Sequence, residues 1–226
     1  MARIRKDEEY NTKRTEIIQA SLKILLEEGY DKFGVNHLLR VMDMSKGAFF
    51  HYFKSKNDLL EGVLEFLSQP IIDNMISIME NPNISAIEKF SRLYQDTASI
   101  KVAYGEGLEM LSQALYMECN KPVLNNVIDR TIKACQPIYE AVIKEGNIAG
   151  VFDVKYVHGT AYHILAMTVR LNQAIAEYML SDHDDVFKDQ LIEKIDTFEF
   201  IVQTSLNCPH LKPLYDFTIL KKGGIL

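Results

Sequence analysis

The sequence predicts an all-α protein, built from a small N-terminal module of three helices and a larger helical domain behind it. Apolar residues recur at three- and four-residue steps along most of the 226-residue chain, which is the period of an amphipathic helix. No segment of the sequence alternates apolar and polar residues with the period of two expected of a half-buried strand. Glycine, proline and asparagine separate the periodic segments, so helices joined by short turns account for the pattern.

The first helix is expected from Lys13 to Glu28, because its apolar residues lie on one stripe and its charged residues elsewhere. Asn11 or Thr12 is available as its N-cap, and Gly29 suits the left-handed position after its end. The stripe consists of Ile17, Ile18, Leu22, Ile24 and Leu25.

Two short helices and one long helix follow. The short ones are expected over 35–42 and 45–53. Ser55 then opens the long helix with a capping box, in which Asp58 takes the place of the usual Glu. Pro70 is expected to kink or end this helix before the apolar pattern resumes.

The rest of the chain is also helical in pattern, up to an irregular tail after Asn207 that is rich in proline and glycine. Further helices are expected near 84–103, 106–118, 122–146, 153–181 and 185–206.

The composition is that of an ordinary soluble protein with an uneven charge distribution. Apolar residues make up 47% of the chain and charged residues 25%, and the net charge of −6 argues against a protein that coats nucleic acid everywhere. Residues 1–56 nevertheless carry 11 Lys and Arg against 8 Asp and Glu, whereas residues 57–226 carry 14 against 23. A mildly basic N-terminal segment followed by an acidic remainder would attract phosphate locally and repel it elsewhere.

The three cysteines, Cys119, Cys135 and Cys208, are far apart and odd in number. They predict no disulfide framework, and they fit buried thiols in a reducing compartment better than a redox sensor. No apolar run reaches the roughly 18–20 residues of a membrane span, and the polar N-terminus is unlike a signal peptide. We therefore expect a cytoplasmic protein without membrane contact.

Three helices with a very short turn between the second and third describe a helix-turn-helix module. The third helix of such a module enters the major groove of DNA with its N-terminal residues leading. Ser45, Gly47 and Ala48 are small enough to let the backbone approach base edges, and Lys46 can donate a hydrogen bond to guanine or phosphate. Three further side chains, those of Tyr52, Lys54 and Lys56, are placed to hold flanking phosphates.

Phe49 and Phe53, four residues apart on the same helix, should face the core of the module. Composition alone leaves an alternative open, in which this basic and aromatic helix is only a solvated face beside a packed three-helix core. The order of the residues favours DNA binding. The run Met44-Ser45-Lys46-Gly47-Ala48-Phe49-Phe50-His51-Tyr52-Phe53, within residues 14–64, resembles the DNA-binding signature of the TetR family.

This resemblance implies a helix-turn-helix DNA-binding domain over residues 1–54 and a helical regulatory and dimerisation domain over 55–226. It also implies which residues contact DNA. Asn36, at the start of the second helix, would lie near a base or phosphate. The third helix would place Ser45, Lys46, Gly47 and Ala48 near bases, with Phe50, Tyr52 and Lys56 near the backbone.

The sequence departs from the family pattern at several positions. Gly34 stands where a capping threonine that touches phosphate is usual, so that contact is lost. Asp43 replaces a glycine in the turn, and Asp tolerates a positive φ better than most residues. Phe50 lacks the hydroxyl of the common tyrosine. Leu39 and Met42 replace small residues, so the helices should pack differently there.

The resemblance further implies that the last two long helices form a four-helix bundle with those of a second copy. Small residues on helix 153–181 would permit close approach, and helix 185–206 carries apolar residues at three- and four-residue steps. The same positions could instead be the internal core of a monomer. The expected dimer residues are Gly159, Ala166, Phe187, Leu191, Ile195, Phe198 and Val202.

Ligand-binding residues are expected among the Met and Tyr side chains of the second domain, which suit adaptable apolar sites but are also common in plain cores. Their number favours an apolar or aromatic small-molecule effector, and the acidic surplus permits a cationic one. The candidates are Tyr94, Met110, Tyr116, Met117, Tyr139, Tyr162 and Met167.

Neither a metal site nor a catalytic site is expected. His158 and His163 are five residues apart, which is a poor spacing for a shared ion on one helix, and Asp182-His183-Asp184-Asp185 fits a turn whose Asp caps the next helix. The sequence contains no G-x-S-x-G, Walker loop, G-x-G-x-x-G or H-E-x-x-H motif. We expect no cofactor and no enzymatic activity.

Together these features predict a dimeric, sequence-specific transcriptional regulator, a repressor that a small-molecule effector releases from a palindromic DNA operator. Two alternatives stay open at this point. One is a DNA-binding protein controlled by protein contacts, and the other is a helical enzyme or ligand carrier whose N-terminal module is only structural. Salt-dependent binding to duplex DNA separates the second alternative from the other two hypotheses.

Overall fold

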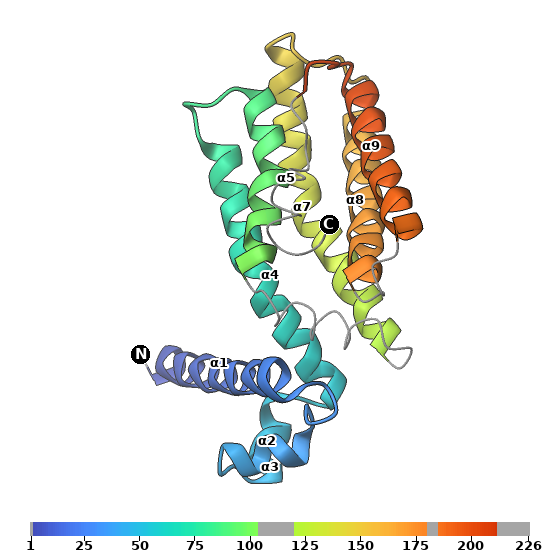
Figure 1. The fold of residues 1–226 in the computed structure, drawn as a ribbon. Helices are drawn as coiled ribbons and strands as arrows, with labels where there is room; N and C mark the ends of the chain where they lie inside the picture. The colour runs from blue at the N-terminus through green and yellow to red at the C-terminus, as the bar shows by residue number, and fades with distance from the viewer. Residues whose placement is uncertain (1, 104–119, 180–184, 212–226) are drawn as a thin grey trace. The chain divides into compact units, whose positions relative to one another are not determined.

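The structure, a computed structural model, describes residues 2–103, 120–179 and 185–211. Within these ranges the chain forms eight α-helices and no strand, so the predicted all-α fold is confirmed (Figure 1). The predicted helix near 106–118 lies outside the described residues.

The described residues divide into two compact units. The first contains residues up to 69 together with 120–127, and the second contains 70–103 and residues from 128 onward. The divisions fall inside two helices, α4 (Lys56–Glu80) and α7 (Lys121–Ile148), so both helices contribute residues to each unit. This division follows compactness and not function, and the predicted boundary of a DNA-binding domain at residue 54 stays a prediction.

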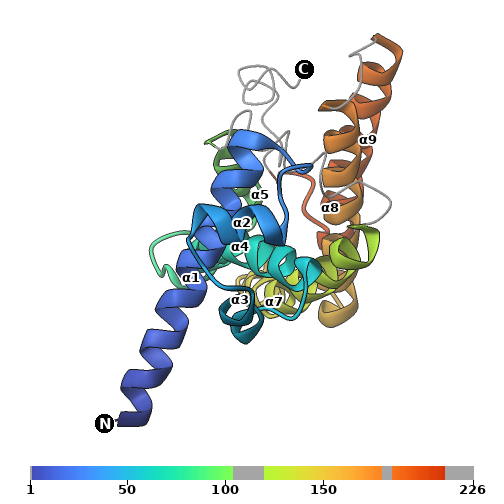
Figure 2. The same cartoon turned by 90° about the horizontal axis from the view of Figure 1, so that it is seen from below.

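The first unit is built from α1 (Ala2–Glu28), α2 (Val35–Val41), α3 (Lys46–Tyr52) and the first turns of α4 and α7 (Figures 1 and 2). Its core contains four of the five residues predicted for the apolar stripe of the first helix, and the fifth is half-buried. The buried four are Ile17, Ile18, Ile24 and Leu25, and the half-buried one is Leu22.

The helix α1 begins eleven residues before the predicted start at Lys13. The Thr12 hydroxyl donates to the carbonyl of Glu8 (2.9 Å), so Thr12 is an interior residue bonded to the preceding turn and is not an N-cap. Residues 2–12 contain no glycine or proline to stop the helix, and the stripe pattern did not reveal its extension because these residues are mostly polar. Gly29 has a φ of +80°, as the prediction of a left-handed residue after this helix requires.

The turn between α2 and α3 depends on Asp43, whose φ is +46°. Its N–H donates to the carbonyl of Arg40 (3.4 Å), and the N–H of Met44 donates to that of Leu39 (2.9 Å). These are the two hydrogen bonds of a Schellman motif, which normally ends on glycine. The expected positive φ at Asp43 is confirmed, and the side chains of Leu39 and Met44 pack partly buried against the core.

The start of α4 has most of the predicted capping box. The Ser55 hydroxyl accepts a hydrogen bond from the N–H of Asp58 (3.0 Å). The Asp58 carboxylate accepts one from the N–H of Lys54 (2.7 Å), one residue before the position that a capping box uses. Further along, Pro70 does not end α4, which continues to Glu80. Its ring is exposed, so water can bond the carbonyl that the proline deprives of its helical donor.

The second unit contains the later parts of α4 and α7 together with α5 (Ala86–Ala103), α8 (Val157–Met179) and α9 (Asp185–Leu206). The helices α8 and α9 lie side by side in both ribbon views (Figures 1 and 2). The predicted helix starting at residue 153 begins four residues later, because Asn147 holds both backbone groups of Val154 in a turn (2.9 and 3.0 Å). The ring of Phe152 lies against Gly146, where a Cβ would be only 2.0 Å from the ring.

Candidate nucleic-acid interface

The recognition helix α3 is short, and a side chain caps its start. Ser45 has extended backbone (φ −72°, ψ 152°), and its hydroxyl accepts a hydrogen bond from the N–H of Ala48 (3.1 Å). The N-cap of α2 lacks such a bond, since Gly34 has no side chain to supply it. The loss of the usual capping contact, expected from the sequence at Gly34, is therefore present in the structure.

The two faces of α3 differ as predicted. Phe49 and Phe53 are buried in the core of the first unit, with their ring centroids 5.9 Å apart. The residues before them on the helix and Phe50 and His51 between them are exposed, and Phe50 has 47% of its surface accessible. Of the nine residues predicted to contact DNA, seven are exposed and two, Tyr52 and Lys56, are partly buried. The exposed ones are Asn36, Ser45, Lys46, Gly47, Ala48, Phe50 and Lys54.

A hollow on this unit brings together predicted residues from two helices. Asn36 of α2 lines it together with Lys46 and Phe50 of α3. The Lys46 ammonium lies 6.0 Å from the centroid of the Phe50 ring, at the outer limit of a cation–π contact. The hollow therefore combines an amide, a cation and an aromatic face, which are groups that can meet bases and phosphates.

Several other polar residues that line this hollow were not predicted, and three of them are in contact. The Nε2 of His37 lies 3.0 Å from one Glu28 carboxylate oxygen, and an Arg40 guanidinium nitrogen lies 3.4 Å from Nδ1 of the same ring. This chain of contacts ties the end of α1 to α2. Glu28 lies in a different helix, nine residues before His37, so the periodicity of a single helix does not reveal this contact.

The end of α3 is held by a residue outside the recognised motif. The ring of Tyr10, from α1, lies 4.9 Å from that of Tyr52 and 5.5 Å from that of His51, centroid to centroid. Tyr52 is partly buried, and this tilted ring contact contributes about 1 kcal/mol to holding it. Only the unexpected length of α1 makes this contact possible.

Lys56, at the start of α4, is also held by aromatic rings. Its Nζ lies 3.9 Å from the centroid of the Tyr30 ring and 5.5 Å from that of Phe33. The side chain of Lys54 is exposed, while its backbone N–H belongs to the cap of α4. The two lysines predicted to lie near phosphates therefore differ, since one is pre-positioned and the other extends into solvent.

The predicted ligand-binding residues do not form one group. Tyr94 and Tyr139 are buried together, with rings 5.8 Å apart, and the Thr168 hydroxyl donates to the Tyr94 oxygen (3.3 Å). Burial raises the pKa of Tyr94 far above its usual value, so its hydroxyl stays neutral. Tyr162 is exposed, and Met167 lines a groove on the outer surface. Met110, Tyr116 and Met117 lie outside the described residues.

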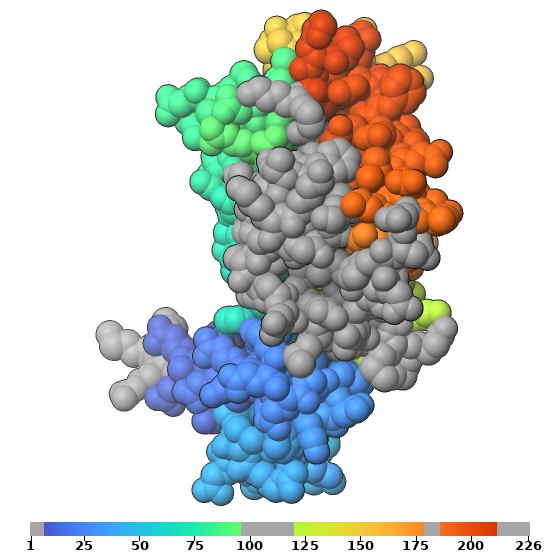
Figure 3. Space-filling view, viewed as in Figure 1, coloured from blue at the N-terminus to red at the C-terminus, as the bar shows by residue number. Residues whose placement is uncertain are grey.

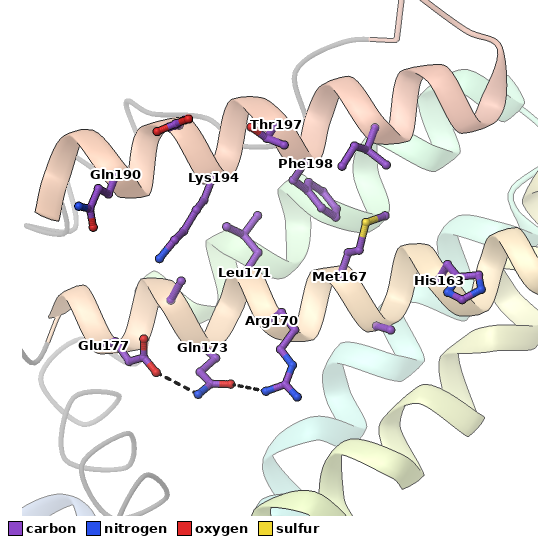
Figure 4. A pocket seen from close by; sticks show the side chains of 14 residues that line it. His163, Met167, Arg170, Leu171, Gln173, Glu177, Gln190, Lys194, Thr197 and Phe198 are labelled. Atoms are coloured by element: carbon purple, nitrogen blue, oxygen red, sulfur yellow. Dashed lines mark hydrogen bonds between the residues drawn. The ribbon is translucent and has the colours of Figure 1, made fainter.

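The groove runs between α8 and α9 (Figure 4). Its floor includes Met167, Leu171 and Phe198, while polar residues line its edges. Along one edge Arg170 donates to Gln173 (3.1 Å), whose amide donates to Glu177 (2.9 Å). The outer side of α9 belongs to the molecular surface (Figure 3).

Four of the seven residues predicted for a dimer interface are buried in the core of their own chain, which was the alternative left open by the sequence. They are Leu191, Ile195, Phe198 and Val202. Gly159, Ala166 and Phe187 are half-buried. The exposed large apolar residues on the described parts of these helices are Tyr162, Val186, Phe200 and Ile201, none of which was predicted for a dimer interface. Periodicity identifies the apolar face of a helix but not the partner that covers it.

The histidines and cysteines of the second unit have ordinary roles. His158 Nδ1 lies 2.8 Å from the Glu140 carboxylate, which lowers the pKa of that carboxyl, and His163 lines the groove. Within the described residues, no three His, Cys, Asp or Glu side chains are arranged to hold a metal ion. Cys135 and Cys208 are buried, and burial raises the pKa of the Cys135 thiol to about 11. Among all residues that the structure describes, no helix combines the length and apolar character needed to cross a bilayer.

Comparison with known proteins defines the class of the first unit. Residues 17–63 match the model of the bacterial regulatory proteins of the tetR family. An uncharacterised HTH-type transcriptional regulator from the lacX 3′ region of Lactococcus lactis is 26% identical over 104 residues, which is 43% of this chain and 53% of that protein. The transcriptional regulator AcuR of Cereibacter sphaeroides is 39% identical over 49 residues, or 22% of each chain. The chain thus matches about half the length, or less, of these relatives.

Solved structures share the fold over most of the chain. A TetR-family transcriptional regulator from Pectobacterium atrosepticum has a TM-score of 0.68 and 16% identity, covering 90% of this chain and 98% of that one. A transcriptional regulator from Cytophaga hutchinsonii has a TM-score of 0.63 and 19% identity, covering 86% and 98%. Residues 17–63, which run from α1 into the start of α4, therefore form a helix-turn-helix DNA-binding module like that of the TetR family, as the resemblance of the sequence predicted.

Substitutions at Ser45 should separate the stability of α3 from its use. Ser45→Ala removes the N-cap acceptor and should lower the free energy of unfolding by about 1 kcal/mol. Ser45→Asp keeps an acceptor at this position and should retain that stability, but its carboxylate should repel DNA and abolish duplex binding. Urea denaturation and fluorescence anisotropy with labelled duplex measure the two effects. Wild-type DNA affinity in the Ser45→Asp variant would contradict the placement of this helix end against DNA.

Proposed function

We propose that this chain is a dimeric, sequence-specific transcriptional regulator, a repressor that leaves a palindromic operator when a small-molecule effector binds its second unit. The observation that carries the proposal is the exposed start of α3, where Lys46, Gly47 and Ala48 follow the N-cap residue Ser45. This helix start lies in the segment that matches the TetR family. Small side chains and one cation at the leading end of a recognition helix suit direct contact with base edges.

Charge supports the same function. The first 56 residues carry a net charge of +3, while the rest of the chain carries −9. A duplex would therefore be attracted to the helix-turn-helix unit and repelled by the remaining surface, which favours binding through that unit alone. Lys46, Lys54 and Lys56 supply three of the eleven cations in the basic part.

Two lysines should have different effects on DNA binding. Lys56→Ala should weaken binding to all sequences about equally, because this residue holds a phosphate. It should also reduce by about one the steepness with which the logarithm of the binding constant falls with the logarithm of salt concentration (the salt slope). Lys46→Ala should also change the base preference, since Lys46 lies at the leading end of α3. Selection of bound sequences from a random duplex library, followed by anisotropy at several salt concentrations, measures both effects.

Lys133→Ala serves as the control for these variants, because Lys133 is an exposed lysine on the part of α7 that belongs to the second unit. It should leave both base preference and salt slope unchanged. If Lys46→Ala lost equal affinity for selected and random duplexes, Lys46 would be a phosphate contact and not a base contact.

The proposed dimer uses the outer faces of α8 and α9. These helices carry exposed apolar residues, Tyr162 of α8 with Phe200 and Ile201 of α9, and Ile201 lines the groove between them. A second copy would cover these residues and bring two helix-turn-helix units together, which a palindromic operator requires. The buried Ile195 would support this face from behind, and Phe198 would form part of the groove floor beneath the partner.

Aspartate substitutions should distinguish the interface from the core behind it. Ile201 has 37% of its surface exposed, so Ile201→Asp should give a folded monomer. Phe198 is buried and its ring lies 5.7 Å from that of Tyr94, so Phe198→Asp should unfold the second unit. Ile148→Asp, at an exposed apolar position of α7, should leave a folded dimer. Light scattering with circular dichroism gives both readouts, and a dimer of unchanged affinity for Ile201→Asp would refute this interface.

An apolar or aromatic effector is proposed for the second unit, as its supply of Met and Tyr side chains favours. Such a ligand would change the distance between the two recognition helices of the dimer. These helices must lie one turn of DNA apart, roughly 34–36 Å, to enter successive major grooves. The compact units divide at Pro70 within α4, so this proline is the proposed pivot.

Effector and operator should weaken each other's binding by the same factor. Coupling of this kind amounts to about 1–3 kcal/mol, or five- to 150-fold in affinity. A panel of apolar and aromatic compounds screened by thermal shift would supply the effector. Calorimetric titration of that compound into the free protein and into the protein–DNA complex then measures the coupling. Equal affinities in the two titrations would mean that the bound compound does not control DNA binding.

A further inference from the structure

Tyr30 touches two functional parts of the first unit at once. Its ring stacks beside that of Phe33, with centroids 5.9 Å apart and planes 25° from parallel. The Lys56 ammonium lies over the Tyr30 face at 3.9 Å from the centroid, well within the range of a cation–π attraction. A lysine side chain otherwise samples many rotamers around a strongly hydrated charge, so this contact restricts where the charge lies.

The hydroxyl of the same residue reaches the start of α7. It donates a hydrogen bond to Oδ1 of Asn120 (2.7 Å), and only 1% of the Asn120 surface is exposed. A buried amide with a short hydrogen bond is expensive to displace, because breaking the bond leaves polar groups without water. The Tyr30 ring is therefore fixed from its far end by a residue ninety positions along the chain.

The first turns of α7 are part of the first unit. Val123 is 2% exposed and belongs to its core, against which Val127 also packs. The Asn126 amide donates to a Glu61 carboxylate oxygen (3.1 Å), which ties the start of α7 to α4 as well as to Tyr30. Beyond Val127 the helix continues into the second unit.

We propose that Tyr30 is a positioning residue for DNA binding, through which the start of α7 sets the place of the Lys56 ammonium. The inference rests on the proposed function, in which Lys56 holds a phosphate. With the Asn120 bond intact the ring is fixed and Lys56 is pre-positioned for its phosphate. When the start of α7 moves, the ring loses its anchor and the phosphate contact weakens. Asn120 thus affects DNA affinity without touching DNA.

A residue that only stabilises the fold would act in the same way whether or not Lys56 is present, whereas a positioning residue would act only through Lys56. The test therefore introduces Tyr30→Phe, Tyr30→Leu and Asn120→Ala into both the wild type and a Lys56→Ala variant. Tyr30→Phe keeps the ring and removes the hydroxyl, while Tyr30→Leu removes both. Asn126→Ala is the matched control, because it breaks the other tie of α7 and leaves Tyr30 untouched.

The probe is a mixed-sequence duplex of about 40 base pairs, long enough for two recognition helices one turn apart. Lys56→Ala should lower affinity about five- to tenfold at low salt, as expected for one phosphate contact. Tyr30→Leu should reproduce most of that loss, and Tyr30→Phe and Asn120→Ala a part of it. None of the three should lower affinity further in the Lys56→Ala background. Asn126→Ala should have the same effect in both backgrounds.

A second readout needs no DNA. Reductive methylation with ¹³C-formaldehyde keeps the charge of Lys56 and adds ¹³C-methyl groups to its Nζ. The Tyr30 ring current should shift the resonance of these methyl groups upfield. Asn120→Ala should move this resonance toward the position of an exposed lysine, and Asn126→Ala should not.

Two results would overturn the inference in a protein that binds duplex DNA. One is an equal loss for Asn120→Ala with and without Lys56, and the other is a Lys56 resonance that Asn120→Ala leaves in place. Absence of salt-dependent DNA binding by the wild type would instead overturn the proposed function, on which the inference rests.

Discussion

The burial of two phenylalanine rings, Phe49 and Phe53, determines what the first unit can present to a partner. A helix of seven residues is not stable by itself, because the cost of nucleating it exceeds what so few hydrogen bonds return. The two rings fix α3 to the unit, with the Arg14 guanidinium 4.8 Å from the Phe53 centroid. Gly62 of α4 allows this approach, since a Cβ there would lie 3.1 Å from the same ring. Because one face of α3 is fixed, the opposite face has to be the outward one.

The second unit depends on packing of a different kind. Aromatic rings from α5, α7, α9 and the turn before α8 meet edge to face, with Phe90 and Tyr139 at 5.7 Å and Phe90 and Phe152 at 6.0 Å. Edge-to-face pairs add about 0.5–1.5 kcal/mol each beyond the burial of their area, and they restrict the angles at which helices can cross. Phe198 connects this aromatic cluster to the groove between α8 and α9. Its ring contacts that of Tyr94 in the cluster, and the same residue lines the groove.

The sequence predicted the features that local chemistry controls. The buried faces of α1 and α3, the positive φ of Asp43 and the cap at Ser55 all depend on neighbours within four residues or so, and periodicity or residue type reveals them. The length of α1, the passage of α4 through Pro70 and the position of the first turn of α8 depend on exposure and on contacts with distant residues. For the same reason the sequence identified Lys56 as a candidate for contact with phosphate but not Tyr30 beside it. It also assigned the inward face of α9 to a partner copy, since an apolar stripe looks the same whichever neighbour covers it.

The membership of residues 120–127 in the first unit affects how the protein is made. As the chain leaves the ribosome, helices α1 to α3 and the start of α4 emerge first, but the buried places of Asn120 and Val123 are still empty. The DNA-binding unit therefore cannot complete its core until synthesis has passed residue 127, although its family signature ends near residue 63. Domains that are continuous in sequence can fold one after the other during translation, whereas this one must wait for a later segment. A nascent chain leaves this part of the core uncovered during that interval.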